Sequence, residues 1–253
     1  MLDINSIHFS IDDKKILDSI TARFEPCMIH GIIGPNGSGK STLLKNICRI
    51  WEPQSGSILI HGTDYTKIPR KELSTLVTLV PQNTTIGFPI SVFDIVAMGR
   101  NPHLGRFAGM RQNDRDIIER ALQQTNIYEL KDRNINELSG GEGQLAIIAR
   151  ALATEASLIL LDEPTSELDV KHTLEILNIL QGFKDQGKTI LVTIHDLNLA
   201  RKFCDTISIL SCGKLFYSGT PENAFAAKII KQVFDVHIRE YKHNDTTFLD
   251  FYT

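Results

Sequence analysis

One glycine-rich segment constrains the fold more than any other part of the chain. It reads Gly34-Pro35-Asn36-Gly37-Ser38-Gly39-Lys40-Ser41, fits the pattern GxxxxGK(S/T), and directly follows the apolar β-branched run 29–33. The pattern belongs to a strand, a tight loop and a helix, in that order. With glycine at about 7% of average usage, it should arise by chance in roughly one chain in a hundred of this size. The segment therefore predicts a strand–loop–helix unit rather than an ordinary turn.

The same segment, called the phosphate loop below, has the chemistry needed to hold phosphate groups. Glycines let backbone N–H groups point inward at phosphate oxygens, and the helix that follows opens with free N–H groups. Lys40 supplies a point charge, and the Ser41 hydroxyl can ligate Mg²⁺. We therefore expect residues from Gly34 to Thr42 to bind the phosphates of a nucleotide.

A second signal is an apolar strand that ends in two carboxylates. The run 158–161 is followed directly by Asp162 and Glu163, and ligands bind at strand ends in α/β sheets. Asp162 suits Mg²⁺, which takes one or two carboxylates plus substrate phosphate. Glu163 could orient and deprotonate an attacking water. Acidic residues are common at strand ends, but together with the phosphate loop this pair predicts hydrolysis of a nucleoside triphosphate.

A third signal lies between the first two. The segment Leu138-Ser139-Gly140-Gly141-Glu142 precedes the helix-like run 146–153. Ser139 is a natural N-cap, and a helix that opens with serine and two glycines presents N–H groups and a positive dipole end. The segment therefore predicts a second anion site, although on its own it would be read as a capped loop.

Apolar runs separated by helix-like stretches predict an α/β architecture with a mainly parallel sheet. The predicted strands are 29–33, 76–80, 158–161, 189–194 and 207–210. The predicted helices are 41–50, 114–124 and 146–153. Residues 84–155 contain helix signals and no convincing strand, which predicts a helical subdomain inserted between the strands.

Composition narrows the class of partner. The chain has 253 residues and is 42% hydrophobic, which is enough for a sizeable core. Its 27 basic and 30 acidic residues give a net charge of -3, without the excess of positive charge that is typical of proteins that bind nucleic acid. The scattered cysteines favour a reducing compartment. No signal peptide and no run long enough to cross a bilayer are found in the sequence, so a membrane role would require a partner.

In this order, the phosphate loop, residues 138–142 and the Asp162-Glu163 pair resemble the ATP-binding cassette family over about residues 2–222. The resemblance implies a P-loop ATPase core with a mainly parallel sheet and an N-terminal antiparallel β region. Residues 1–253 would form a single ATPase domain, with the helical subdomain at about 84–155 inserted in the core and a C-terminal extension at about 224–253. Residues 138–142, called the signature segment below, match the motif for which the family is known.

The resemblance also implies roles for further residues. Gln82, after Val80-Pro81, would be the switch glutamine that senses Mg²⁺ and the membrane partner. His195 would contact the γ-phosphate of ATP, and residues 166–169 would cross a dimer interface. Mg²⁺ would be organised by Ser41, Gln82 and Asp162. In the family, the signature segment of one subunit closes over ATP on the phosphate loop of the other, which implies a homodimer with head-to-tail ATP sites.

The segment from Gly99 to Phe107 resembles the one that follows the switch glutamine in importers of ferric siderophores, haem and cobalamin. The alternative is a basic surface loop with a proline kink. The importer interpretation implies integral membrane permease subunits as partners, indirectly a substrate-binding protein, and a place on the cytoplasmic face of the inner membrane. Two other readings are a soluble cassette ATPase acting in translation or DNA maintenance and a P-loop kinase, which would leave the signature segment unexplained.

Three positions depart from the family pattern. Ile11 stands where an aromatic residue usually stacks on adenine, Leu145 where an arginine usually follows the glutamine after the signature, and Glu167 where a small residue is common. Phe9 lies two residues before Ile11 and would face the same side of a strand. Either Phe9 stacks on adenine or adenine meets an aliphatic surface, and we favour the second. Trp51 is expected to be a packing residue.

Overall fold

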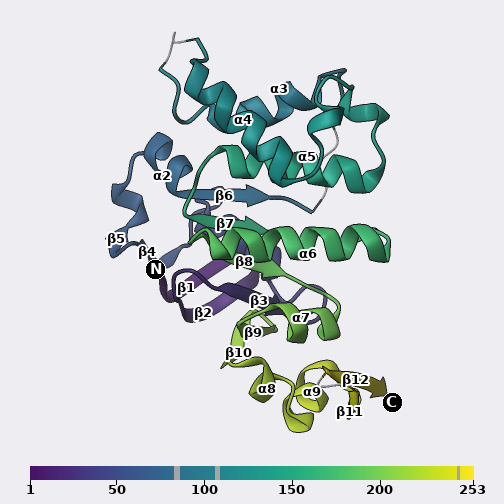
Figure 1. Ribbon diagram of the computed structural model, residues 1–253. Helices are drawn as coiled ribbons and strands as arrows, with labels where there is room; N and C mark the ends of the chain where they lie inside the picture. Colours follow the sequence, from purple (N-terminus) through teal and green to yellow (C-terminus); the bar gives the residue numbers. More distant parts are fainter. Residues whose placement is uncertain (83–85, 106–108, 244–245) are drawn as a thin grey trace. The chain divides into compact units, whose positions relative to one another are not determined.

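The computed structural model describes residues 1–82, 86–105, 109–243 and 246–253. These form two compact units, the first made of Met1–Lys67 and Thr189–Thr253 and the second of Ile68–Lys188. The first unit holds β1 (Leu2–Ile11), β2 (Lys14–Phe24), β3 (Ile29–Ile33), α1 (Lys40–Ile47), β4 (Ser55–Ile60), β5 (Thr63–Asp64), η1 (Tyr65–Lys67), β8 (Thr189–Thr193), α7 (Leu197–Phe203), β9 (Thr206–Ser211), β10 (Lys214–Gly219), α8 (Pro221–Ala224), α9 (Ala227–Phe234), β11 (His237–His243) and β12 (Thr246–Tyr252) (Figure 1). The second unit holds α2 (Arg70–Leu76), β6 (Val77–Val80), α3 (Val92–Ala97), η2 (Met98–Arg100), α4 (Gln112–Gln124), η3 (Tyr128–Leu130), η4 (Ile135–Glu137), α5 (Gly140–Ala153), β7 (Leu158–Leu161) and α6 (Val170–Asp185).

Strand pairing confirms the predicted fold class. In the first unit β3 pairs in parallel with both β8 and β9, and β10 pairs antiparallel with β9. A separate antiparallel sheet in the order β2-β1-β4-β5 forms the predicted N-terminal β region. In the second unit β6 and β7 are parallel, with Val80 opposite Leu161. All residues of β3 and β7 are buried. Burial on both faces explains why β7 is an unbroken apolar run and why His30 and Gly31 are the only residues that interrupt the isoleucines of β3.

Helix boundaries differ from the prediction where local capping decides them. Helix α1 ends at Ile47 rather than at residue 50, because Arg49 adopts a left-handed φ of 56°. Helix α5 begins at Gly140, directly after the predicted N-cap Ser139, and so adds six residues in front of the helix-like run 146–153. Helix α6, whose N-cap Asp169 accepts a hydrogen bond from the backbone of His172, lies where no helix was predicted.

The second unit contains the segment predicted to be a helical subdomain. Between residues 86 and 155 the described residues form α3, η2, α4, η3, η4 and α5, with one isolated β-bridge between Ser91 and Asn134. Residues 84, 85 and 106–108 lie outside the described residues. The boundaries at 84 and 155 stay a prediction, and the compact unit itself runs from Ile68 to Lys188.

The last thirty residues carry structure that their sequence did not indicate. They form α9 and the β11–β12 hairpin, which lie side by side (Figure 1). The Asn198 side chain on α7 donates to the Leu249 carbonyl at 3.0 Å and accepts from the Leu249 N–H at 2.7 Å, and Leu249 is buried. The hairpin is therefore fixed to α7. Within the described parts of the chain, no helix is both long and apolar enough to cross a membrane.

Candidate functional site

The phosphate loop of the first unit has a backbone that only glycine permits at two positions. A Cβ on Gly34 would lie 2.1 Å from the Leu210 carbonyl oxygen. Gly39 adopts φ of 104°, and a Cβ there would lie 2.8 Å from the Leu17 side chain. Real Cβ atoms do not come so close to a backbone oxygen, so Gly34 must be a glycine, while the left-handed φ favours glycine at Gly39.

The polar groups of the loop suit phosphate. The Lys40 ammonium is buried and donates to the carbonyls of Gly34 at 2.9 Å and Pro35 at 3.3 Å, which holds it across the loop. The buried Ser38 hydroxyl has no hydrogen-bond partner among the described residues. No described side chain caps α1, and its first turn has no acidic residue. An anion at this helix end would satisfy the Ser38 hydroxyl and meet the positive end of the helix dipole. Ser41 and Thr42 are half-buried in that first turn.

His195 lies at the same edge of the parallel strands as the phosphate loop. Ile32 of β3 is paired with Thr193 of β8, so Gly34 and His195 each follow two residues after this pair. His195 is exposed, and the next residue, Asp196, caps α7 by accepting from two backbone N–H groups at 2.8 and 3.0 Å. The carboxyl edge of parallel strands is where ligands bind in α/β proteins.

In the second unit, the two predicted carboxylates, Asp162 and Glu163, directly follow strand β7. The Asp162 N–H donates to the Val80 carbonyl at 2.9 Å, which extends the β6–β7 ladder by one residue and leaves Asp162 buried. Glu163 then turns out of the ladder with a left-handed φ of 50°. Its carboxylate accepts a hydrogen bond of 2.6 Å from the Gln82 amide. The structure therefore joins Gln82 and Glu163, which are far apart in sequence.

The signature segment forms the predicted helix cap. Ser139 N–H and hydroxyl both donate to the Glu142 carboxylate at 2.8 Å, and the Glu142 N–H lies 3.3 Å from the Ser139 hydroxyl. The hydrogen bond from the Ser139 backbone, followed by that from its hydroxyl, lowers the pKa of Glu142 below its usual range. Ser139 and Gly140 are exposed, so this helix end is open to a ligand or a partner.

Gly141 explains why the signature segment needs a second glycine. A Cβ on Gly141 would lie 2.5 Å from the His172 ring. That ring is held by its Nδ1, which donates to the Asp169 carboxylate at 2.9 Å. This contact of His172 was not predicted, because no local spacing links His172 to the signature segment.

A cleft of about 290 Å³ in the second unit brings these groups together. Its lining includes Gln82, Glu163, Ser139, Gly140 and Glu167. Sequence reasoning did not place the signature segment of a chain beside that same chain's Glu163. Glu167 is exposed and adopts a left-handed φ of 64°, a conformation that suits the small residue expected there. Gln144 also lines the cleft, and its side-chain nitrogen is buried with no partner among the described residues.

The structure shows whether the residues at and near the positions that depart from the family pattern are buried or exposed. Phe9 is buried and stacks on Trp51, with ring centroids 5.4 Å apart and planes at 8°, so Trp51 packs as predicted. Ile11 is 44% exposed. The Phe9 ring is therefore engaged in the core, and which of the two residues would meet adenine stays a prediction. Leu145 is buried within α5.

The segment 99–107, which resembles a segment of importers, is buried at Arg100. Arg100 is only 4% exposed and forms ion pairs with Asp114 at 3.0 Å and Glu155 at 2.8 Å. The alternative of a basic surface loop is therefore wrong for this residue. Arg106 and Phe107, at the end of the segment, lie outside the described residues.

The fold and the loop together define the class: an α/β protein that binds nucleotide phosphates at the carboxyl edge of parallel strands. The ABC transporter family profile matches residues 17–166 of the chain. The chain also shares 36% identity over 248 residues with the hemin import ATP-binding protein of Pseudomonas entomophila, covering 96% of each protein. The chain therefore belongs to the ABC transporter family, whose cassettes bind and hydrolyse ATP, and the predicted family is confirmed.

Two further comparisons agree with this placement. The cobalamin import ATP-binding protein of Halobacterium salinarum is 33% identical over 94% of the chain, which spans only 59% of that longer relative. A solved structure described as an inward-facing conformation of a metal-chelate type ABC transporter superposes with a TM-score of 0.87 at 29% identity. The superposition covers 99% of the chain and 96% of the solved chain.

Proposed function

We propose that this chain is the ATP-hydrolysing subunit of an importer that takes up a metal chelate, such as a ferric siderophore or haem, or cobalamin. The single observation that supports import most strongly is the near end-to-end match to a hemin import ATP-binding protein, at 96% of both lengths. The match to a metal-chelate type transporter over 99% of the chain supports the same class of cargo. The cargo itself would contact the membrane subunits and the substrate-binding protein, and not this chain.

In the proposed reaction, residues from Gly34 to Thr42 hold the phosphates of ATP. Ser41, Asp162 and Gln82 would hold Mg²⁺, which would neutralise phosphate charge when bound. Glu163 takes the proton of the attacking water, and His195 steadies the γ-phosphate. The buried Ser38 hydroxyl and the buried Asp162 support the phosphate and metal roles, and the contact of 2.6 Å between Gln82 and Glu163 supports a base whose orientation depends on the switch glutamine.

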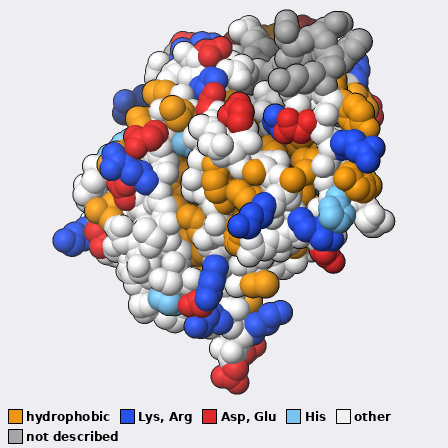
Figure 2. All heavy atoms as spheres, turned by 90° about the horizontal axis from the view of Figure 1, so that it is seen from below, with side chains coloured by type: hydrophobic (Ala, Val, Ile, Leu, Met, Phe, Trp, Pro, Cys, Tyr) orange, Lys and Arg blue, Asp and Glu red, His pale blue; other side chains and the backbone are white. Residues whose placement is uncertain are grey.

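The proposed assembly is a homodimer with two head-to-tail ATP sites, bound to integral membrane permease subunits on the cytoplasmic face of the inner membrane. The exposed Ser139 and Gly140 at the open end of α5 support a role toward ATP on a second subunit. Residues 1–253 then act as one ATPase domain, with the subdomain at about 84–155 and the extension at about 224–253. On the face seen in Figure 2, basic and acidic side chains are interspersed, which does not favour nucleic acid as the partner.

The assignment of Glu163 is tested by Glu163→Gln. The amide keeps the size of the side chain but cannot take a proton, so kcat should fall by about 10²- to 10⁴-fold while ATP still binds. Steady-state hydrolysis, calorimetry with Mg-ATP and gel filtration with ATP measure the three consequences. Glu167→Gln, in the same cleft, is the matched control and should keep most of the activity. Near-normal turnover in Glu163→Gln would contradict the proposal.

The importer assignment has its own test. The tagged chain, solubilised from native membranes, should co-purify with a multi-spanning membrane protein. Recovery of ribosomes or DNA instead would favour a soluble cassette ATPase acting in translation or DNA maintenance.

A further inference from the structure

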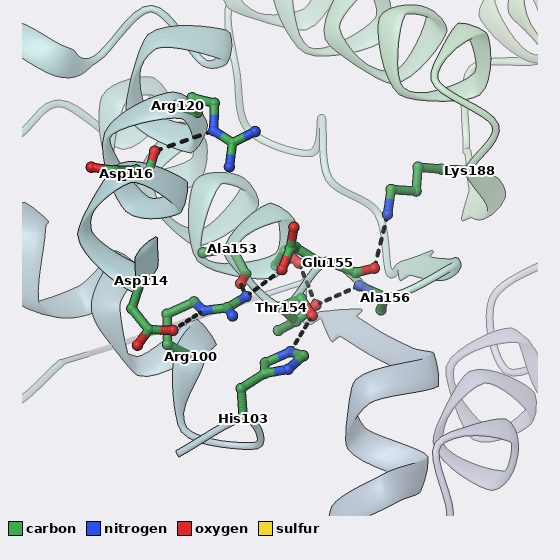
Figure 3. Close-up of polar contacts among 11 residues, drawn as sticks. Arg100, His103, Asp114, Asp116, Arg120, Ala153, Thr154, Glu155, Ala156 and Lys188 are labelled. Atoms are coloured by element: carbon green, nitrogen blue, oxygen red, sulfur yellow. Dashed lines mark hydrogen bonds and ion pairs between the residues drawn. The ribbon is translucent and has the colours of Figure 1, made fainter. Parts of the chain in front are cut away.

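Helix α5 carries the signature segment at its amino end, and its carboxyl end is held by a buried arginine. The Arg100 guanidinium donates through Nε to the Asp114 carboxylate at 3.0 Å. Through one terminal nitrogen it donates to the Ala153 carbonyl and to the Glu155 carboxylate, both at 2.8 Å. Figure 3 shows Arg100 lying between Asp114 of α4 and the last residue of α5. A planar guanidinium can satisfy three acceptors at fixed angles, which a lysine cannot.

Asp114 makes this link specific, because it serves α4 at the same time. Its second carboxylate oxygen accepts from the Arg111 N–H at 3.0 Å and so caps α4. That backbone hydrogen bond, followed by the contact with Arg100, lowers the pKa of Asp114 below its usual range. The carboxylate therefore stays charged at neutral pH, and the start of α4 is tied to the end of α5 through one ion pair.

Two further residues of the same segment hold the same helix end. The His103 ring donates from Nε2 to the Thr154 carbonyl at 2.8 Å, since a carbonyl can only accept (Figure 3). Gly99 lets η2 lie directly on α5, because a Cβ there would be 2.2 Å from the Arg150 carbonyl oxygen. The final carbonyls of α5, which no helical N–H can satisfy, thus receive donors from Arg100 and His103.

Arg100 is remote from the cleft that contains the signature segment. Helix α5 has 14 residues, and at 1.5 Å per residue it is about 21 Å long. Ser139 caps one end and Ala153 accepts from Arg100 at the other. Arg100 is not among the residues that line the cleft. Helix α5 connects the residue that accepts from Arg100 with the residue that caps the signature segment.

We propose that Arg100, with His103, is a positioning residue for Ser139: by fixing the carboxyl end of α5 to η2 and α4, it sets where the signature segment stands. This inference rests on the proposed function for its kinetic test. It assigns a role to the segment 99–103 that the resemblance alone left open. The pair formed by Arg100 and Asp114 makes α5 and α4 move as one piece.

The test is a double-mutant cycle on ATP turnover between Arg100→Lys and Ser139→Ala. Arg100→Lys keeps the charge and loses the fork, so α5 should shift and kcat should fall by about 10- to 100-fold. ATP affinity, measured by calorimetry, should stay within about twofold, because the phosphate loop lies in the first unit. In the Ser139→Ala background, Arg100→Lys should cost less than about threefold, because the group it positions is gone. Arg120→Lys on α4 is the matched control and should leave kcat unchanged, because Arg120 is exposed and its hydrogen bond in Figure 3 goes to the Asp116 carbonyl of the same helix.

A second readout works without ATP turnover. Amide hydrogen exchange over residues 140–145 should be about tenfold faster in Arg100→Lys, and exchange over residues 40–45 should not change. If Arg100→Lys does not fold, the pair His103→Ala and His103→Gln replaces it, since the glutamine amide can still donate to the Thr154 carbonyl and should rescue both readouts. Fold-losses in kcat that multiply in the double variant, or unchanged exchange over 140–145, would overturn the inference. A wild-type chain that does not hydrolyse ATP would overturn the proposed function instead, while the exchange result would still decide the positioning role.

Discussion

His30 is a buried histidine whose surroundings determine its charge. Its ring lies 2% exposed in β3, edge-on to Phe24. Nε2 donates to the Glu25 carbonyl at 2.8 Å, so Nδ1 of the neutral ring accepts from the Thr206 hydroxyl at 2.6 Å. Burial lowers the pKa of His30 below its ordinary value of 6.5. The native state therefore keeps the ring neutral at pH values where the unfolded chain would already bind a proton.

The consequence is a pH-dependent stability. At pH values well above 6.5 neither state is protonated at His30, and its contribution is fully present. As the pH falls below 6.5, the unfolded chain takes up the proton first, so the free energy of unfolding should fall by at most about 1.4 kcal/mol per pH unit from this residue. Urea denaturation between pH 5 and 8 measures the slope for wild type and for His30→Gln, which cannot titrate. An equal slope in the two proteins would contradict the assignment.

The missing aromatic at Ile11 gives a second residue-scale prediction. Ile11→Tyr should tighten ATP binding about fivefold or more, since stacking on a base is worth roughly 1–3 kcal/mol. Phe9→Ala should leave ATP affinity nearly unchanged and destabilise the fold by about 3–5 kcal/mol, because it removes the ring packed on Trp51. Competition between ATP and GTP, with denaturant unfolding, measures both. A large loss of ATP affinity in folded Phe9→Ala would show that Phe9 contacts adenine after all.

At the scale of elements, the sequence predicted the strands that are buried along their whole length and the helix cap that depends on local residue spacing. Strand β7 is apolar at every position, β3 is buried throughout although it includes His30, and the spacing of Ser139 and Glu142 predicts the cap of α5. Helix α6 was missed although its buried residues, which include Thr173, Ile176, Leu177, Leu180 and Phe183, recur at helical spacing. Two further apolar residues, Val170 and Leu174, are exposed and widen the apolar part of the helix surface. Strand β1 was expected from the family resemblance and not from its own pattern, because its register shifts interrupt the alternation of apolar and polar residues.

In the candidate site, too, contiguous motifs were predicted from the sequence, and contacts between distant residues were not. The phosphate loop and the Asp162-Glu163 pair are contiguous motifs, so their residue types and order were enough to find them. The contact between Gln82 and Glu163 joins residues 81 positions apart, and the buried pair of Arg100 and Asp114 joins residues 14 apart. No periodicity links such positions, and only the packing of the elements brings them together.

Two glycines of α5 should respond to alanine in opposite ways. Gly141→Ala places a methyl group 2.5 Å from the His172 ring, which Asp169 holds, and should lower thermal stability. Gly143→Ala meets nothing within 4 Å and should raise stability by up to about 1 kcal/mol through helix propensity. Thermal unfolding followed by circular dichroism measures both variants. Equal effects would show that the His172 contact does not restrict Gly141.

At the scale of the whole molecule, the groups proposed for one reaction are distributed over the two units. The phosphate loop and His195 belong to the first unit, while Gln82, Asp162, Glu163 and Ser139 belong to the second. In the proposed homodimer, Lys40 and Glu163 of one subunit serve the same ATP, and Ser139 serves the ATP of the other subunit. In a homodimer of one variant, each substitution affects both ATP sites. A mixture of two variants can therefore show which residues serve the same ATP site.

Mixing subunits that carry different defects tests the shared site. Lys40→Ala should fail to bind ATP tightly, and Ser139→Arg should bind ATP but not hydrolyse it, because a bulky cation blocks closure over the other subunit's nucleotide. In a 1:1 mixture half of the dimers are mixed, and each mixed dimer has one intact site, so about a quarter of wild-type turnover should return. The control is Lys40→Ala mixed with Glu163→Gln: both defects lie on the same side of a site, so no intact site forms and no activity should return. Equal recovery in the two mixtures, or none in the first when tagged pull-down shows mixed dimers, would mean that Ser139 serves the ATP of its own chain.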